Sequence, residues 1–123
     1  MNITTRVEGS NLSITIGAAN VSKYTRLQAS AAGFVVAGIA TIGDVIVERD
    51  ALANSVGVAS RATNAPGTQF GIASGAIAVG DELYAAANGA VSSTQATGAI
   101  VIGRAVSDAA DTQVVNYFVH SVV

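Results

Sequence analysis

Cysteine and tryptophan are absent from this chain of 123 residues, and histidine and proline occur once each. Without cysteine the protein can form neither disulfides nor thiolate metal sites, and it has no thiol nucleophile. The single histidine, His120, excludes a multi-histidine metal site and a histidine-dependent catalytic triad within one chain. Stability must therefore come from packing and from association with other chains.

Charged residues are scarce, at 11% of the chain, and the formal net charge is -2. Binding to nucleic acid requires several phosphates to be neutralised together, so we expect no nucleic-acid partner. A segment that mixes basic and aromatic residues, and that could contact a base or the rim of a protein partner, occurs once, at Lys23-Tyr24-Thr25-Arg26. The lysines and arginines are scattered singly, at Arg6, Lys23, Arg26, Arg49, Arg61 and Arg104.

Long apolar runs are also missing. None approaches the roughly 20 residues that a membrane helix needs. The first residues lack the basic-then-apolar order that is typical of a signal peptide. We therefore expect no membrane partner, and we expect synthesis in a cytoplasm.

The apolar half of the chain consists mainly of alanine, valine and isoleucine, because only 5% of the residues are aromatic. Small side chains each bury little surface, and burial stabilises by only about 25 cal/mol per Å². A surface with few charges also suits burial against other chains. The composition therefore predicts a homo-oligomer.

Strand-like patterns extend along most of the chain. Leu12 to Ile16 alternates apolar and polar residues, as a half-buried strand does. From Phe34 onward, glycine separates short apolar runs roughly every eight to twelve residues, which is typical of a small β-sandwich or β-barrel. Helix is confined to two short candidates, 29–32 and 50–55. The expected strands are 12–16, 35–37, 45–48, 56–59, 82–85, 90–92, 100–105 and 113–119.

Two regions are harder to interpret. The segment 17–30 is either a long connection or an irregular strand, and the segment 20–32 leaves the N-terminal topology open. In the last expected strand Tyr117 and Phe118 lie on opposite faces, so both faces are predicted to be covered.

A repeated phrase predicts an internal duplication. Ile42–Val47 and Val79–Tyr84 each place a Gly-Asp turn before a short β-forming run, and each is followed by a second similar phrase, Val56–Ala59 or Ile102–Ala105. The single proline, in the turn 64–67, separates the two copies. The predicted organisation is an extended arm (1–11) and one β-rich domain (12–123) that contains copies at about 34–62 and 71–106.

Three dipeptides are predicted to be structural turns: Gly43-Asp44, Gly80-Asp81 and Asn88-Gly89. Asn-Gly supplies two adjacent residues that tolerate positive φ, which a type I′ hairpin requires. An aspartate after glycine accepts backbone N–H groups, and this role is favoured over an acid and base pair formed by Asp44 and Asp81. Asp81 and Glu82 are too few ligands for a calcium cage. The sequence thus predicts no catalytic residue, no cofactor and no metal.

A longer pattern resembles a known family. Ile77–Tyr84, Asn88–Val91 and Ile102–Val106 resemble, in this order, segments of the capsid decoration or cement proteins of tailed bacteriophages. The resemblance covers about residues 33–119. It implies an all-β, tulip- or barrel-like subunit without enzymatic activity. It also implies a homotrimer on the outside of the phage head that bridges neighbouring subunits of the major capsid protein.

The N-terminal arm is polar with two spaced apolar residues, so it could add a strand to a partner's exposed sheet edge. Two alternatives stay open: a tail or fibre-base subunit of the same kind of particle, and a trimeric β-barrel enzyme whose site is shared between subunits. The capsid-contact candidates are Met1, Asn2, Ile3, Thr4, Thr5, Arg6 and Val7.

Overall fold

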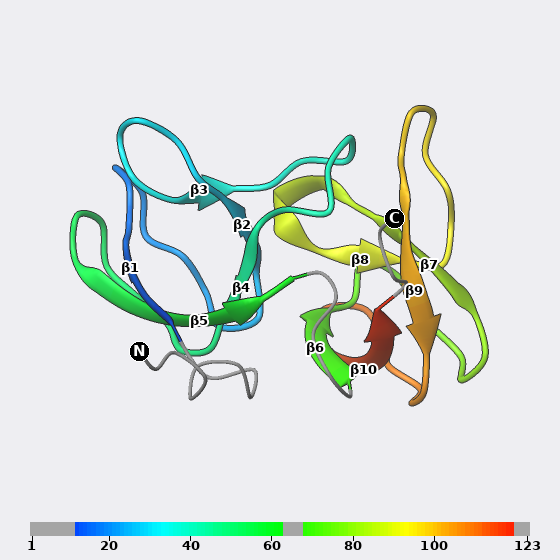
Figure 1. The fold of residues 1–123 in the computed structure, drawn as a ribbon. Helices are drawn as coiled ribbons and strands as arrows, with labels where there is room; N and C mark the ends of the chain where they lie inside the picture. The colour runs from blue at the N-terminus through cyan, green and yellow to red at the C-terminus, as the bar shows by residue number, and fades with distance from the viewer. Residues whose placement is uncertain (1–11, 63–67, 120–123) are drawn as a thin grey trace, which may run out of the picture.

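The computed structural model describes residues 12–62 and 68–119, and this part of the chain is all β. Figure 1 shows its two sheets, each of five strands, and every pair of neighbouring strands is antiparallel. The first sheet has the order β1 (Leu12–Thr15), β5 (Val56–Arg61), β4 (Val45–Val47), β2 (Arg26–Gln28), β3 (Val35–Val36). The second has the order β6 (Thr68–Ile72), β10 (Val114–Val119), β9 (Val101–Ala105), β7 (Glu82–Ala85), β8 (Val91–Ser92).

The all-β prediction is confirmed, and the sandwich is the architecture found, because neither sheet closes into a barrel. The alternating segment at the N-terminal end forms β1, in which Ile14 is buried and Leu12 is partly exposed. Neither helix candidate forms a helix; both segments are turns and extended backbone. Within the described residues, the one segment with 3₁₀-type hydrogen bonding is Ala87–Gly89, and it is a turn and not a helix because Asn88 has φ 61° and ψ 28°.

Two strands lie where the sequence left a strand open or did not predict one. β2 lies inside the segment 17–30, for which a connection and an irregular strand were both kept, and β6 lies in a glycine-containing stretch without clear alternation and was not predicted. Both pair with a neighbour far along the chain, β2 with β4 and β6 with β10. Such non-local pairing, and not local propensity, makes these segments strands.

The two sheets are copies of one strand arrangement. When the five strands of each sheet are counted in chain order, the first pairs with the fifth, the fifth with the fourth, the fourth with the second, and the second with the third. The connections repeat as well: the N–H of Tyr24 donates to the carbonyl of Val47 at 2.7 Å, and that of Gly80 donates to Ala105 at 2.9 Å. We call two residues equivalent when they occupy the same strand and register position in the two sheets or make matching hydrogen bonds in the connecting loops.

This duplication differs from the one predicted. The turn Gly43-Asp44 precedes β4, the fourth strand of its sheet, whereas Gly80-Asp81 precedes β7, the second strand of the other. The two phrases are therefore not equivalent, and the copies are β1–β5 and β6–β10 instead of 34–62 and 71–106. A Gly-Asp turn depends only on its own residues and can precede any strand, so it does not indicate the order of strands in a sheet.

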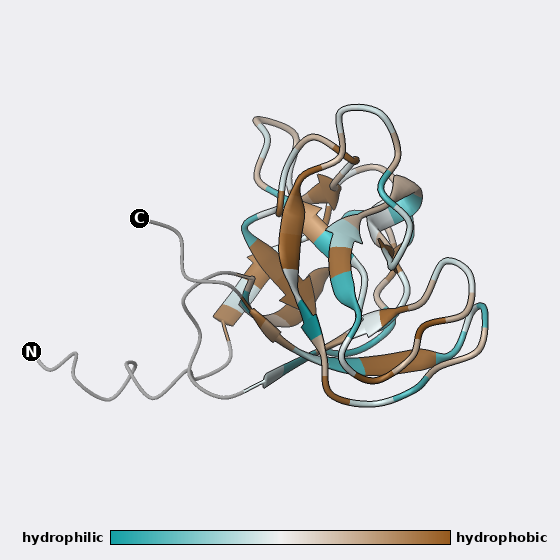
Figure 2. Cartoon of the chain, turned by 90° about the vertical axis from the view of Figure 1, so that its right-hand side faces the viewer, coloured by the Kyte–Doolittle hydropathy of each residue, from teal (hydrophilic) through white to brown (hydrophobic). Residues whose placement is uncertain are grey.

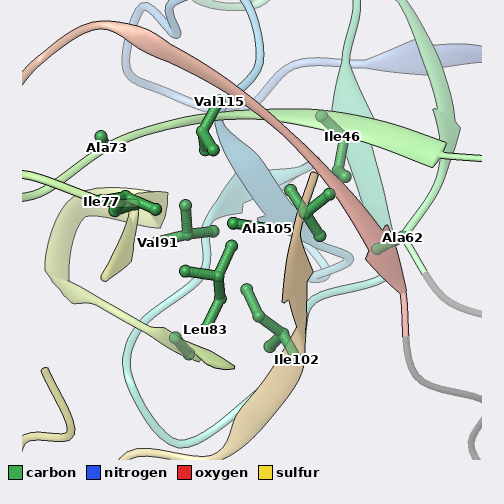
Figure 3. Close-up of a cluster of buried hydrophobic side chains, with 11 residues drawn as sticks. Ile46, Ala62, Ala73, Ile77, Leu83, Val91, Ile102, Ala105 and Val115 are labelled. Atoms are coloured by element: carbon green, nitrogen blue, oxygen red, sulfur yellow. The ribbon is translucent and has the colours of Figure 1, made fainter. Parts of the chain in front are cut away.

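Two clusters of buried side chains form the core. One lies on a single face of the first sheet and includes Ile14, Leu27 and Val47. The other fills the second sheet's inner face and also contains Ile46 and Ala62 of the first half, as Figure 3 shows. The second sheet therefore covers the opposite face of the first. Figure 2 shows hydrophobic colouring concentrated along the strands.

Candidate functional site

The junction between the two sheets is built around one arginine. Arg26 in β2 is fully buried, and its guanidinium donates five hydrogen bonds to backbone carbonyls. Two acceptors belong to the second sheet's hairpin, Ala86 at 2.8 Å and Ala90 at 3.1 Å. The other three are in the loop before β4: Gly38, Thr41 and Ile42. The five N–H donors of the arginine are thus all used, two of them across the junction between the halves.

Burial lowers the pKa of Arg26, and the neighbouring Tyr117 has a smaller, opposite effect. Burial also raises the pKa of Tyr117 to about 12, so its hydroxyl is neutral at physiological pH. A buried guanidinium is tolerated when hydrogen bonds replace its hydration. Because the carbonyls use all its donors, Arg26 has a structural role and no free donor for a ligand.

The Asn88-Gly89 turn lies against this arginine. Asn88 has φ 61° and Gly89 has φ 72°, and the N–H of Ala90 donates to the carbonyl of Ala87 at 3.3 Å, as in a type I′ turn. A Cβ on Gly89 would overlap the Thr25 methyl and would lie 2.8 Å from the Arg26 carbonyl oxygen. Glycine is therefore required both for its backbone conformation and for close contact between the two halves.

The two predicted turn aspartates bind backbone groups. Asp44 Oδ2 accepts the N–H of Ala29 at 2.8 Å, and Asp81 Oδ2 accepts the N–H of Ala78 at 2.9 Å. Gly43 and Gly80, which precede them, both have φ 92°. The two carboxylates belong to different sheets and non-equivalent strands, so the duplication does not bring them together as an acid and a base.

Sequence reasoning missed a second pair of aspartates. Asp50 Oδ1 accepts the N–H of Lys23 at 2.7 Å, and its equivalent Asp108 accepts the N–H of Val79 at 2.8 Å. Each carboxylate ties the loop before the last strand to the loop before the second strand. The identical dipeptides Asp50-Ala51 and Asp108-Ala109 were the sequence signal that could have identified the true register of the repeat.

The mixed basic and aromatic segment is smaller than the sequence indicated. Lys23 Nζ lies 5.1 Å from the centre of the Tyr24 ring, and that ring lies 5.1 Å from the ring of Phe70. Arg26, however, is buried at the junction and contributes no surface charge. The exposed patch therefore carries a single cation.

Two open hollows lie on the surface of the described residues. One, of about 450 Å³, is lined by residues 20–22 and 50–52, and the other, of about 290 Å³, lies where the hairpin turn meets the loop containing Asp111. Neither lining contains histidine, lysine or arginine. Their carboxylates already accept backbone N–H groups, Asp50 from Lys23 and Asp111 from Gly75.

No cluster of three or more metal-ligating side chains occurs in residues 12–62 and 68–119. In the same residues no helix is both long and apolar enough to cross a membrane. The capsid-contact candidates Met1–Val7, the proline turn 64–67 and His120 lie outside the described residues.

The fold is similar to that of a solved structure. No protein-family model matches the sequence, and no curated protein matches it either. The crystal structure of the head fiber gp8.5 N base in bacteriophage phi29 matches with a TM-score of 0.73 and 23% sequence identity. The match covers 89% of this chain and 94% of that chain, so the two have the same fold over nearly their whole lengths.

Proposed function

We propose that this chain is a structural protein of a tailed-phage virion that decorates the outside of the head and bridges neighbouring major capsid protein subunits. The observation that carries the proposal is the fold shared with a head fiber base over 94% of that chain. The sequence resemblance to decoration proteins independently supports a place on the outside of the phage head. The proposal includes no enzymatic activity.

The chemistry of the described residues supports a structural role. The buried cation Arg26 bonds only to carbonyls, and the carboxylates of Asp44, Asp50, Asp81 and Asp108 bond to backbone N–H groups. These side chains stabilise turns and the junction. The enzyme alternative assumed a closed barrel, and the two sheets are open.

A second candidate function is the base of a head fibre. The solved structure with the matching fold is itself described as such a base, which favours this alternative over a tail subunit. Quantitative mass spectrometry of purified virions distinguishes the two functions. A decoration protein is present in a number of copies close to that of the capsid lattice sites, whereas a fibre base that occupies few sites is present in far fewer.

We further propose that residues Met1–Val7 contact the capsid by adding a strand to an exposed sheet edge, and that the protein acts as a homotrimer. The test mixes the full chain, or a chain lacking these residues, with shells without decoration, followed by pelleting and by circular dichroism of the unbound protein. Binding of the full chain, with loss of occupancy but no loss of β signal in the shortened one, is the expected result. Equal occupancy of both would place the capsid contact elsewhere, and no binding of the full chain would contradict decoration.

A further inference from the structure

The duplication permits a comparison of one face in the two sheets. In the first sheet Arg26, Ile46 and Ser60 form a row across β2, β4 and β5. In the second sheet the equivalent row across β7, β9 and β10 consists of Glu82, Arg104 and Phe118. The register is the same in both rows.

The second half of the chain covers the row in the first sheet. Ile46 is fully buried within the core cluster of the second sheet. Ser60 is buried, and its hydroxyl lies 3.3 Å from Oε1 of Gln69 in β6. Arg26 bonds to two carbonyls of the second sheet's hairpin. The first half of the chain thus binds the second half through this face.

The equivalent face of the second sheet is open and more apolar. Phe118 is 54% exposed, although aromatic residues on both sides of this strand had predicted that both faces would be covered. On the same face, Phe70 is 43% exposed and Val114 is 42% exposed. Where this face of the first sheet has Ser13 and Ser60, the second has Phe70 and Phe118. The change is from hydroxyl to phenyl at the surface, where both phenyl groups remain exposed although the Phe70 ring lies 5.1 Å from that of Tyr24.

We infer that the Phe118 face, defined as Phe70, Val114 and Phe118, binds a second copy of this chain. The first sheet provides the precedent at the position of Phe118, because its equivalent Ser60 is buried against the other copy of the motif. Ser13 and Val56, the equivalents of Phe70 and Val114, are exposed.

Around the Phe118 face lie uncharged Thr68 and Asn116 and one opposed pair of charges, Glu82 and Arg104, which suits a partner of low charge such as this chain. The inference rests on the self-association included in the proposed function and adds the surface that carries it.

A homotrimer requires a heterologous contact, in which the Phe118 face of one copy meets a different surface of the next. Heterologous contacts close into rings when the rotation permits, and otherwise they extend into filaments. A closed ring of three copies is the arrangement that agrees with the proposed homotrimer.

The test replaces the phenylalanines with the residue that the first sheet has at the equivalent positions. Phe118→Ser and Phe70→Ser should each weaken self-association about tenfold or more in sedimentation equilibrium, as loss of a central aromatic contact does. Val79→Ser is the matched control, because Val79 is 60% exposed but lies outside this face. It should leave association unchanged. A wild-type chain that stays monomeric, or variants that associate like the wild type, would overturn the inference.

A second measurement identifies the occupant. The chain has no cysteine, so Thr68→Cys, at the exposed position opposite Phe118, can be labelled at one position with an environment-sensitive fluorophore while both phenylalanines are kept. Emission that shifts to the blue as protein concentration rises supports binding by a second copy. A blue-shifted emission that is independent of concentration would mean that a segment of the same chain covers the face, and would overturn the inference. Both measurements are made without shells, so a failure of capsid binding is a separate result.

Discussion

Nη2 of Arg26 donates a hydrogen bond of 2.8 Å to the carbonyl of Ala86, and this bond joins the second strand of one sheet to the hairpin of the other. The equivalent of Arg26 in the second sheet is Glu82, which is only half-buried. The junction therefore depends on a residue that only one of the two copies carries. The same asymmetry leaves the Phe118 face open.

Replacing Arg26 with methionine should destabilise the protein strongly. The variant keeps much of the side-chain volume but leaves carbonyls such as those of Ala86 and Thr41 without donors, and we expect a loss of about 3–5 kcal/mol in the free energy of unfolding. Urea denaturation followed by circular dichroism measures it. The control is Arg61→Met at an exposed position, which should change stability by less than about 0.5 kcal/mol. Similar stabilities of the two variants would contradict the role given to Arg26.

Gly89→Ala should cost more than Gly98→Ala. Both glycines have positive φ, 72° and 83°, so both substitutions impose backbone strain of about 1 kcal/mol. Only at Gly89 would the added Cβ overlap Thr25 and approach Arg26; at Gly98 nothing lies within 4 Å. Thermal unfolding of the two variants isolates the steric contribution. Equal losses would show that the hairpin can move away from the junction.

Asp50→Ala and Asp108→Ala should lower stability by similar amounts, about 0.5–2 kcal/mol each, since each removes one equivalent bond to a backbone N–H group. Chemical denaturation of both variants provides the comparison. A loss in one variant only would mean that the two loops are not energetically equivalent.

Stability should fall at high pH because of Tyr117. Its pKa is raised to about 12 in the folded protein, against about 10 for an exposed tyrosine, so the folded state holds the proton more tightly. The stabilisation is complete below about pH 10 and is lost as the pH rises through about 12, a total of about 3 kcal/mol. Denaturation between about pH 8 and 12 measures this loss, and Tyr117→Phe, which cannot ionise, should show a smaller decrease. Parallel pH profiles would assign the loss to other groups.

Local chemistry was predictable from the sequence. The alternation in 12–16 and the Asn88-Gly89 pair identified a strand and a type I′ turn, because side-chain periodicity and tolerance of positive φ depend on a few adjacent residues. The absence of cysteine likewise excluded disulfides and thiolate metal sites directly from composition.

Only the tertiary structure decided the strand order, the register of the duplication and the burial of Arg26. β1 pairs with β5, and Arg26 bonds to Ala86 and Ala90, across long stretches of intervening chain. A basic residue beside Lys23 and Tyr24 is locally indistinguishable from a surface residue. The second copy of the motif buries it, and carbonyls of that copy together with those of the loop before β4 replace water around the guanidinium. That compensation exists only once both sheets have formed.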